Sequence, residues 1–110
     1  MSNLYSIVGF FGGFPFKGYF KKENENKING VVIDDLGYSQ ILGDFNETFL
    51  RFIRIPFDNS FAIKMPYEYK FKNGLWIGKY MVGDFSGDTI CDILQIPEHF
   101  NFNKRVNIRN

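Results

Sequence analysis

The sequence predicts a single small all-β domain, an antiparallel up-and-down barrel of about eight strands. Three observations predict this fold: apolar residues recur with a period of two, aromatic residues make up 19% of the chain, and eleven glycines are spread along it. A period of two is the pattern of strands, and Phe and Tyr both favour strands and bury large areas. A chain of 110 residues has room for one domain and one core.

The alternation defines each strand in turn. For example, Phe16, Gly18 and Phe20 share one face of a strand, while Lys17 and Lys21 share the other. The expected strands cover residues 4–11, 16–21, 28–35, 38–45, 49–55, 61–71, 75–82 and 88–96. Short connections between successive strands imply that neighbours in sequence are also neighbours in the sheet.

Turn sequences separate these strands. Asn73-Gly74 predicts a two-residue type I′ hairpin, because both turn residues there need a positive φ. Residues 23–27 predict a polar turn, and residues 83–87 predict a longer turn before the last strand. Pro66 lacks an amide proton, so it must lie at an edge, a bulge or a break.

Closure of the sheet follows from its edges. Eight antiparallel strands in an open sheet would leave two unpaired edges, and closing the sheet removes them. Glycines inside the predicted strands allow the sharp coiling that a narrow barrel requires; they are Gly18, Gly30, Gly43 and Gly78. We therefore favour a closed barrel over a sandwich, with residues 1–97 as the barrel domain and 98–110 as a C-terminal tail.

Composition disfavours several classes of partner. Thirteen basic and twelve acidic residues give a net charge of +1, so the basic excess of a nucleic-acid binder is missing and no nucleic acid is expected. The apolar run over residues 4–16 is too short to span a bilayer and has no basic residue before it, so we expect no membrane association. The single cysteine, Cys91, cannot form an internal disulfide. We expect a cytoplasmic protein without a cofactor.

No established catalytic signature is present. A Cys-His nucleophilic pair would have to join Cys91 to His99, and Cys91 is more simply a small core residue. Asp84, Asp88 and Asp92 could offer oxygen ligands to calcium, but their spacing fits no EF-hand, and Asp with Gly is typical of turns. We therefore assign no catalytic residue and no metal ligand.

Two charged residues continue apolar strand faces. Asp34 follows Ile28 and Val32 on one face, and Arg54 follows Phe52 on another. Such a residue either lies at the mouth of a barrel or is buried with a partner, as a ligand anchor or as an internal ion pair. The aromatic residues on these strand faces can likewise either line a ligand pocket or pack in the core. The candidate ligand-binding residues are Asp34, Arg54, Tyr67, Tyr69, Trp76 and Tyr80.

The order of these short motifs resembles a group of uncharacterised calycin-like (lipocalin- or avidin-like) bacterial β-barrel domains. The resemblance covers residues 16–95, and Arg54 stands where the group has a lysine. It is carried by residues 28–37, Gly43-Asp44-Phe45, residues 50–54, Tyr67-Glu68-Tyr69 and residues 76–80. The resemblance implies an eight-stranded barrel whose interior is either filled or holds one small ligand, and it transfers no catalytic residue.

Two functions from different classes remain open. The first is a non-enzymatic binding domain that holds a small, partly apolar ligand in or at the mouth of the barrel. The second is a protein-interaction or accessory module with a filled core, working through a protein partner or as a homodimer. An enzyme is a third hypothesis, and it would need a perturbed carboxylate or Cys91 in a cleft.

Overall fold

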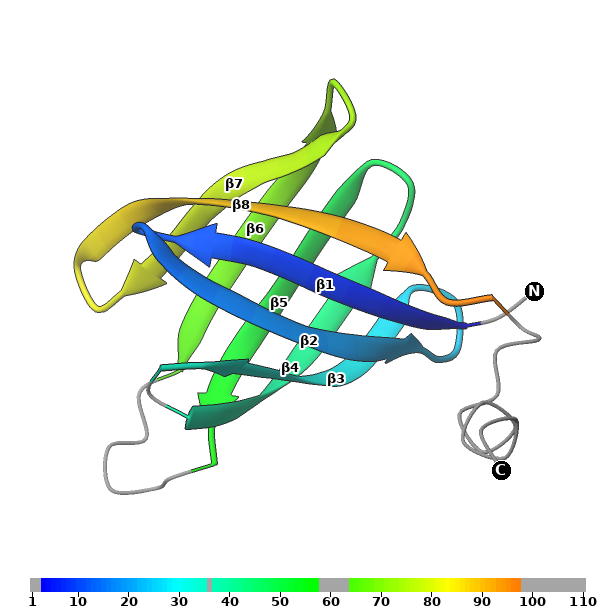
Figure 1. Ribbon diagram of the computed structural model, residues 1–110, viewed down its shortest axis with the longest axis horizontal. Helices are drawn as coiled ribbons and strands as arrows, with labels where there is room; N and C mark the ends of the chain where they lie inside the picture. The colour runs from blue at the N-terminus through cyan, green and yellow to red at the C-terminus, as the bar shows by residue number, and fades with distance from the viewer. Residues whose placement is uncertain (1–2, 36, 58–63, 98–110) are drawn as a thin grey trace, which may run out of the picture.

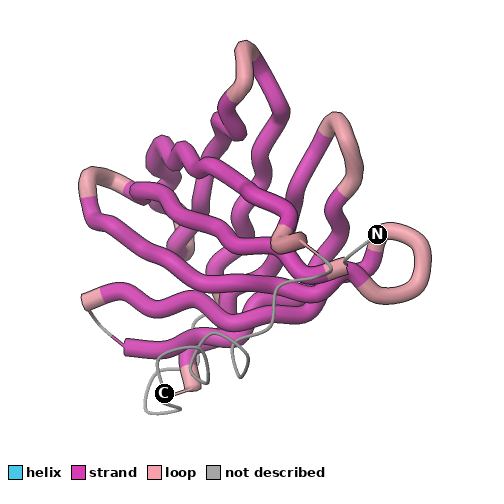
Figure 2. Tube along the Cα trace, turned by 45° about the vertical axis from the view of Figure 1, so that its right-hand side comes forward, coloured by secondary structure: helices cyan, strands magenta, loops and turns pink. Residues whose placement is uncertain are grey.

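The computed structural model describes residues 3–35, 37–57 and 64–97, and these residues form a closed antiparallel barrel of eight strands. Each strand pairs with the next along the chain, and β8 closes the barrel by pairing with β1 (Figure 1). The turns and connections lie at the two ends of the barrel (Figure 2). The strands are β1 (Leu4–Phe11), β2 (Phe14–Lys22), β3 (Lys27–Asp34), β4 (Gly37–Phe45), β5 (Phe49–Pro56), β6 (Met65–Lys72), β7 (Leu75–Val82) and β8 (Phe85–Gln95). No helix that could cross a bilayer occurs in these ranges.

Most of the predicted strands and turns are confirmed. Asn73 and Gly74 have φ angles of 54° and 84°, as a type I′ hairpin requires. The turn predicted over residues 83–87 is wrong, because Val82 already pairs with Phe85 and the turn has only two residues. The predicted tail, residues 98–110, and the first part of the strand predicted over 61–71 lie outside the described residues.

Pro66 lies at a local edge, as its missing amide proton predicted. It pairs with Ile53 of β5, whereas the pairing of β6 with β7 begins one residue later, between Tyr67 and Tyr80. The proline therefore removes no hydrogen bond from the β6–β7 ladder.

Aromatic rings fill the described interior. The ring centroids of Phe52 and Tyr67 are 4.8 Å apart in a stacked arrangement, and those of Phe45 and Trp76 are 5.4 Å apart. Inward-facing glycines let neighbouring backbones approach closely. A Cβ at Gly78 would lie 1.7 Å from the Glu68 carbonyl oxygen, so a side chain has no room there.

A row of alternating charges crosses the outer face of six strands. Lys27 lies 3.2 Å from Asp44, Arg51 lies 3.5 Å from the same carboxylate, and Lys79 is bonded to Asp88. In order from β3 to β8, the paired positions hold Lys27, Asp44, Arg51, Glu68, Lys79 and Asp88. Opposite charges at directly paired positions stabilise a sheet by roughly 0.2–1 kcal/mol each. A shifted register would lose this alternation, so the row favours the observed pairing.

Replacing Gly78 with alanine should lower the free energy of unfolding by about 3 kcal/mol or more, because the new Cβ would force the β6 and β7 backbones apart. The matched control is Gly83→Ala. Gly83 has a φ of 58° but no atom within 4 Å of a new Cβ, so only backbone strain of about 1–2 kcal/mol is expected. Urea unfolding of both variants measures the difference, and equal losses would contradict the close approach at Gly78.

Candidate functional site

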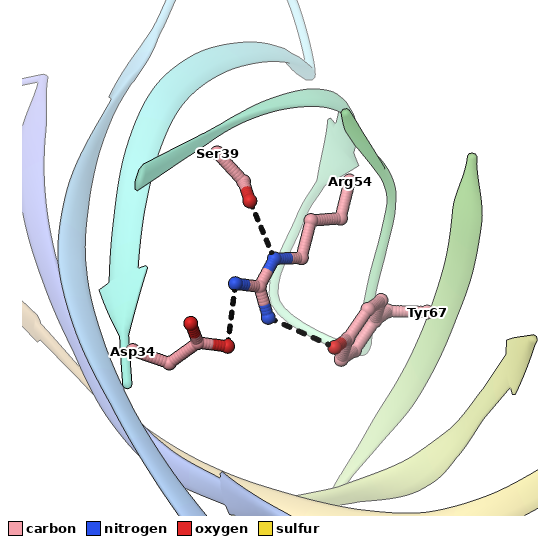
Figure 3. A network of polar contacts seen from close by, with 4 residues as sticks. All are labelled: Asp34, Ser39, Arg54 and Tyr67. Atoms are coloured by element: carbon pink, nitrogen blue, oxygen red, sulfur yellow. Dashed lines mark hydrogen bonds and ion pairs between the residues drawn. The ribbon is translucent and has the colours of Figure 1, made fainter. Parts of the chain in front are cut away.

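A buried arginine organises one end of the barrel. The Arg54 guanidinium donates three hydrogen bonds: from Nη2 to Asp34 Oδ2 at 2.6 Å, from Nε to Ser39 Oγ at 2.9 Å, and from Nη1 to the Tyr67 hydroxyl at 3.4 Å (Figure 3). The side chains of Arg54 and Asp34 are only 4% and 3% exposed. A charge so deeply buried needs a partner, and this ion pair supplies one for each residue.

Strand register brings these residues together. Asp34 is the last residue of β3 and pairs with Gly37, the first residue of β4. Two residues further along β4, Ser39 pairs with Pro56 of β5. Because inward-facing side chains alternate along each strand, Asp34, Ser39 and Arg54 all point into the same end of the barrel.

A pocket of about 340 Å³ opens at this end of the barrel. Its polar wall consists of Arg54, Asp34 and Ser39. The rest of the lining is mostly apolar and comprises Phe11, Gly37, Tyr38, Pro56, Phe57 and Met65. We call this hollow the mouth pocket. Its volume and its few converging polar groups are typical of small-molecule sites.

A second hollow, of about 400 Å³, lies over the outer faces of β5, β6 and β7. Its lining includes Arg51, Glu68 and Lys79, which belong to the row of alternating charges. It is more open than the mouth pocket, and exposed charges of both signs surround it. The mouth pocket is therefore the better candidate site for a small ligand.

The predicted site residues separate into two groups. Asp34 and Arg54 line the mouth pocket, and Tyr67 is linked to it only through its hydrogen bond to Arg54. The Tyr80 ring stacks on Tyr67 with centroids 5.7 Å apart. The remaining two, Tyr69 and Trp76, are in the core. Trp76 packs on Phe45 and Phe71, next to the β6–β7 turn at the other end of the barrel. The ion pair, left open by the sequence, is the arrangement that Asp34 and Arg54 adopt.

The buried hydroxyl of Tyr69 is held by a second, smaller network. Its oxygen lies 2.8 Å from Thr89 Oγ1, and Thr89 in turn donates to the carbonyl of Phe10 at 2.9 Å. Since Thr89 has a single hydroxyl hydrogen, Tyr69 is the donor in the first bond. Burial raises the pKa of the Tyr69 phenol and that of the Cys91 thiol well above their ordinary values. Both groups are therefore protonated at neutral pH.

Sequence reasoning missed several residues of the mouth pocket. Ser39 accepts a hydrogen bond from Arg54, and Phe11 lies under the guanidinium, 5.3 Å from its central carbon. Ser39 could have been found, because it alternates with Ile41 and Phe45 on the inward face of β4. Phe11 could not, since it meets Arg54 across the interior from β1, a strand that does not pair with β5. Met65 could not either, since its place opposite Arg54 depends on the register between β5 and β6.

The comparisons with known proteins add no relative. No family model, no curated protein and no solved structure matches this chain. The closed eight-stranded antiparallel barrel agrees with the architecture that the resemblance to calycin-like domains implies.

Replacing Arg54 with methionine should lower the free energy of unfolding by about 3–5 kcal/mol, because the Asp34 carboxylate would remain buried without its cation. The double variant Arg54→Met with Asp34→Leu should recover most of that loss, since no unpaired charge remains. A matched control is Lys79→Ala, which breaks an exposed pair and should cost less than about 1 kcal/mol. Unfolding in urea measures all three, and losses that simply add in the double variant would contradict the pairing.

Stability should fall in alkaline solution above about pH 9. In the unfolded chain Cys91 and Tyr69 lose their protons near their ordinary pKa values of 9.0 and 10.0, whereas burial keeps them protonated in the fold. Below the unfolded-state pKa of each group, its contribution to stability is fully present. Above that pKa only the unfolded chain gives up the proton, so the free energy of unfolding falls by about 1.4 kcal/mol per pH unit for each group. The Cys91→Ala variant should lose the decline between pH 9 and 10 and keep the later one. Urea unfolding across this range is the measurement, and an unchanged profile in the variant would contradict the assignment.

Proposed function

We propose that this protein is a non-enzymatic binding domain that holds a small, partly apolar ligand in the mouth pocket. The observation that carries the proposal is the mouth pocket itself, in which a buried, hydrogen-bonded Arg54 lies against mostly apolar walls. Such a combination orients a ligand through a few polar contacts and gains affinity from apolar burial.

Packing of the interior supports a site at the mouth over a site deep in the barrel. Tyr69 and Trp76 contact other core side chains in the space that a deeper ligand would need. Tyr67 is also 1% exposed and stacks on Phe52. A ligand at the mouth, in contrast, displaces no core ring.

Architecture gives this proposal further support. An eight-stranded barrel encloses just enough space for its own side chains or for one small ligand. From the sequence we expect a closer likeness to calycin-like bacterial domains, a cytoplasmic location and no nucleic acid among the partners. Each of these stays a prediction.

A specific observation also favours the second candidate, a protein-interaction module. Phe10, Ile77 and Ile90 pair across β1, β7 and β8, and their side chains are 51%, 45% and 37% exposed. Pro15, opposite Phe10 on β2, extends this outer apolar row. Contiguous exposed apolar residues are typical of protein contact surfaces. The row is on the outside of the barrel, so its use would not exclude a ligand at the mouth.

A neutral probe of mixed character, 4-phenylbutanamide, should bind the native protein and shift the backbone NMR signals of residues around the mouth pocket. The variant Met65→Trp should abolish binding, because the larger side chain fills the pocket. Leu75→Trp is the matched control, since Leu75 is 41% exposed next to the opposite turn, and it should bind normally. Unchanged binding in Met65→Trp would contradict the site. No probe binding, together with a dimer in sedimentation velocity that Phe10→Ser disperses, would favour the second candidate.

A further inference from the structure

We propose that the ligand of the mouth pocket presents an uncharged hydrogen-bond acceptor to Arg54, such as an amide or ketone carbonyl, and that the pocket rejects carboxylates and phosphates. This inference rests on the proposed function, because it specifies the chemistry of the ligand at that same site.

The charge of Arg54 is balanced within the protein. A buried arginine usually suggests an anionic ligand, but here Asp34 already neutralises Arg54 through a 2.6 Å contact. Both side chains are at most 4% exposed, so solvent screens their interaction little. The pair has no net charge. An anionic ligand would lose its hydration and find no unbalanced cation in return.

The nearby exposed charges do not alter this balance. Among the described residues, Asp35 follows Asp34 and Lys64 precedes Met65, so the charged chain neighbours of the pocket lining carry opposite charges. Both are exposed to solvent, where their effect is screened.

The hydrogen-bonding groups of the mouth pocket favour a ligand that accepts hydrogen bonds. A guanidinium has five N–H groups, and three of those of Arg54 donate to described residues, so Nη1 and Nη2 each carry a second hydrogen. Ser39 accepts from Arg54 and has a hydroxyl hydrogen of its own. Apart from the Asp34 carboxylate, each polar side chain that lines the pocket thus has an N–H or O–H that can donate. A carbonyl oxygen is the complementary group.

The apolar walls define the other part of the ligand. Phe11, Tyr38, Phe57 and Met65 surround the space above the polar wall. These side chains suit an aromatic ring or a short aliphatic chain. A ligand with an apolar body and one neutral carbonyl therefore matches both parts of the pocket.

The test compares two probes of nearly the same shape, 4-phenylbutanamide and 4-phenylbutanoate, at neutral pH. In the native protein the amide should bind at least tenfold more tightly than the carboxylate, measured by calorimetric or NMR titration. The variant Asp34→Asn removes the balancing anion and keeps the size of the side chain, so it should reverse the preference. Met65→Trp, which occludes the pocket, should abolish binding of either probe.

The outcomes distinguish this inference from the proposed function. Equal binding of the two probes, or tighter binding of the carboxylate to the native protein, would overturn the inference and leave a ligand site at the mouth. No binding of either probe would overturn both. The comparison in the native protein decides the question even if Asp34→Asn does not fold.

Discussion

The closure of eight strands into a narrow barrel is the constraint on which the rest of the structure depends. The interior is too small for a second layer, so side chains from all directions must fill it without colliding. This protein combines large aromatic rings with inward-facing glycines that leave room for them. Tyr80 shows the combination clearly: a Cβ at Gly87 would lie 2.6 Å from its ring, and one at Gly12 would lie 2.6 Å from its hydroxyl oxygen. Rings over glycine backbones are a recognised way to pin strand register in curved sheets.

Within this filled interior, the buried ion pair lies where polar contacts replace aromatic packing. The aromatic core makes few polar contacts, whereas Arg54 donates three hydrogen bonds, to Asp34, Ser39 and Tyr67. These partners come from three other strands, so the network also ties β3, β4, β5 and β6 together at one end. Side chains that are placed on strands and fixed by such a network are preorganised, which would lower the entropic cost of binding at the proposed site.

Alternation along the chain predicted the strands and their faces, and the unpaired edges of an open sheet together with glycines inside the strands predicted the closed barrel. The inward positions of Asp34 and Arg54 follow from the alternation of side chains along a strand, because each residue continues a face of apolar residues. Their contact does not follow, since the shear that aligns the end of β3 with the end of β5 depends on every register between them. The turn after β7 was predicted too long because Asp, Ser and Gly are turn residues, yet Ser86 and Gly87 lie within β8. Here the cross-strand pairing of Met81 with Ser86 and of Tyr80 with Gly87 overrides local propensity.

The outer row of alternating charges has a consequence for how this protein can change over evolution. Each interior member of the row has oppositely charged neighbours on two strands, so reversing one charge would place it beside two like charges. Reversing its neighbour as well restores one attraction but creates a like-charge contact on the neighbour's far side, so the number of like-charge contacts stays at two. Reversing Lys79 together with Asp88, at the end of the row, leaves only the contact with Glu68 unfavourable. Sign changes in this row should therefore be accepted more readily when they extend together to an end of the row than singly at an interior position.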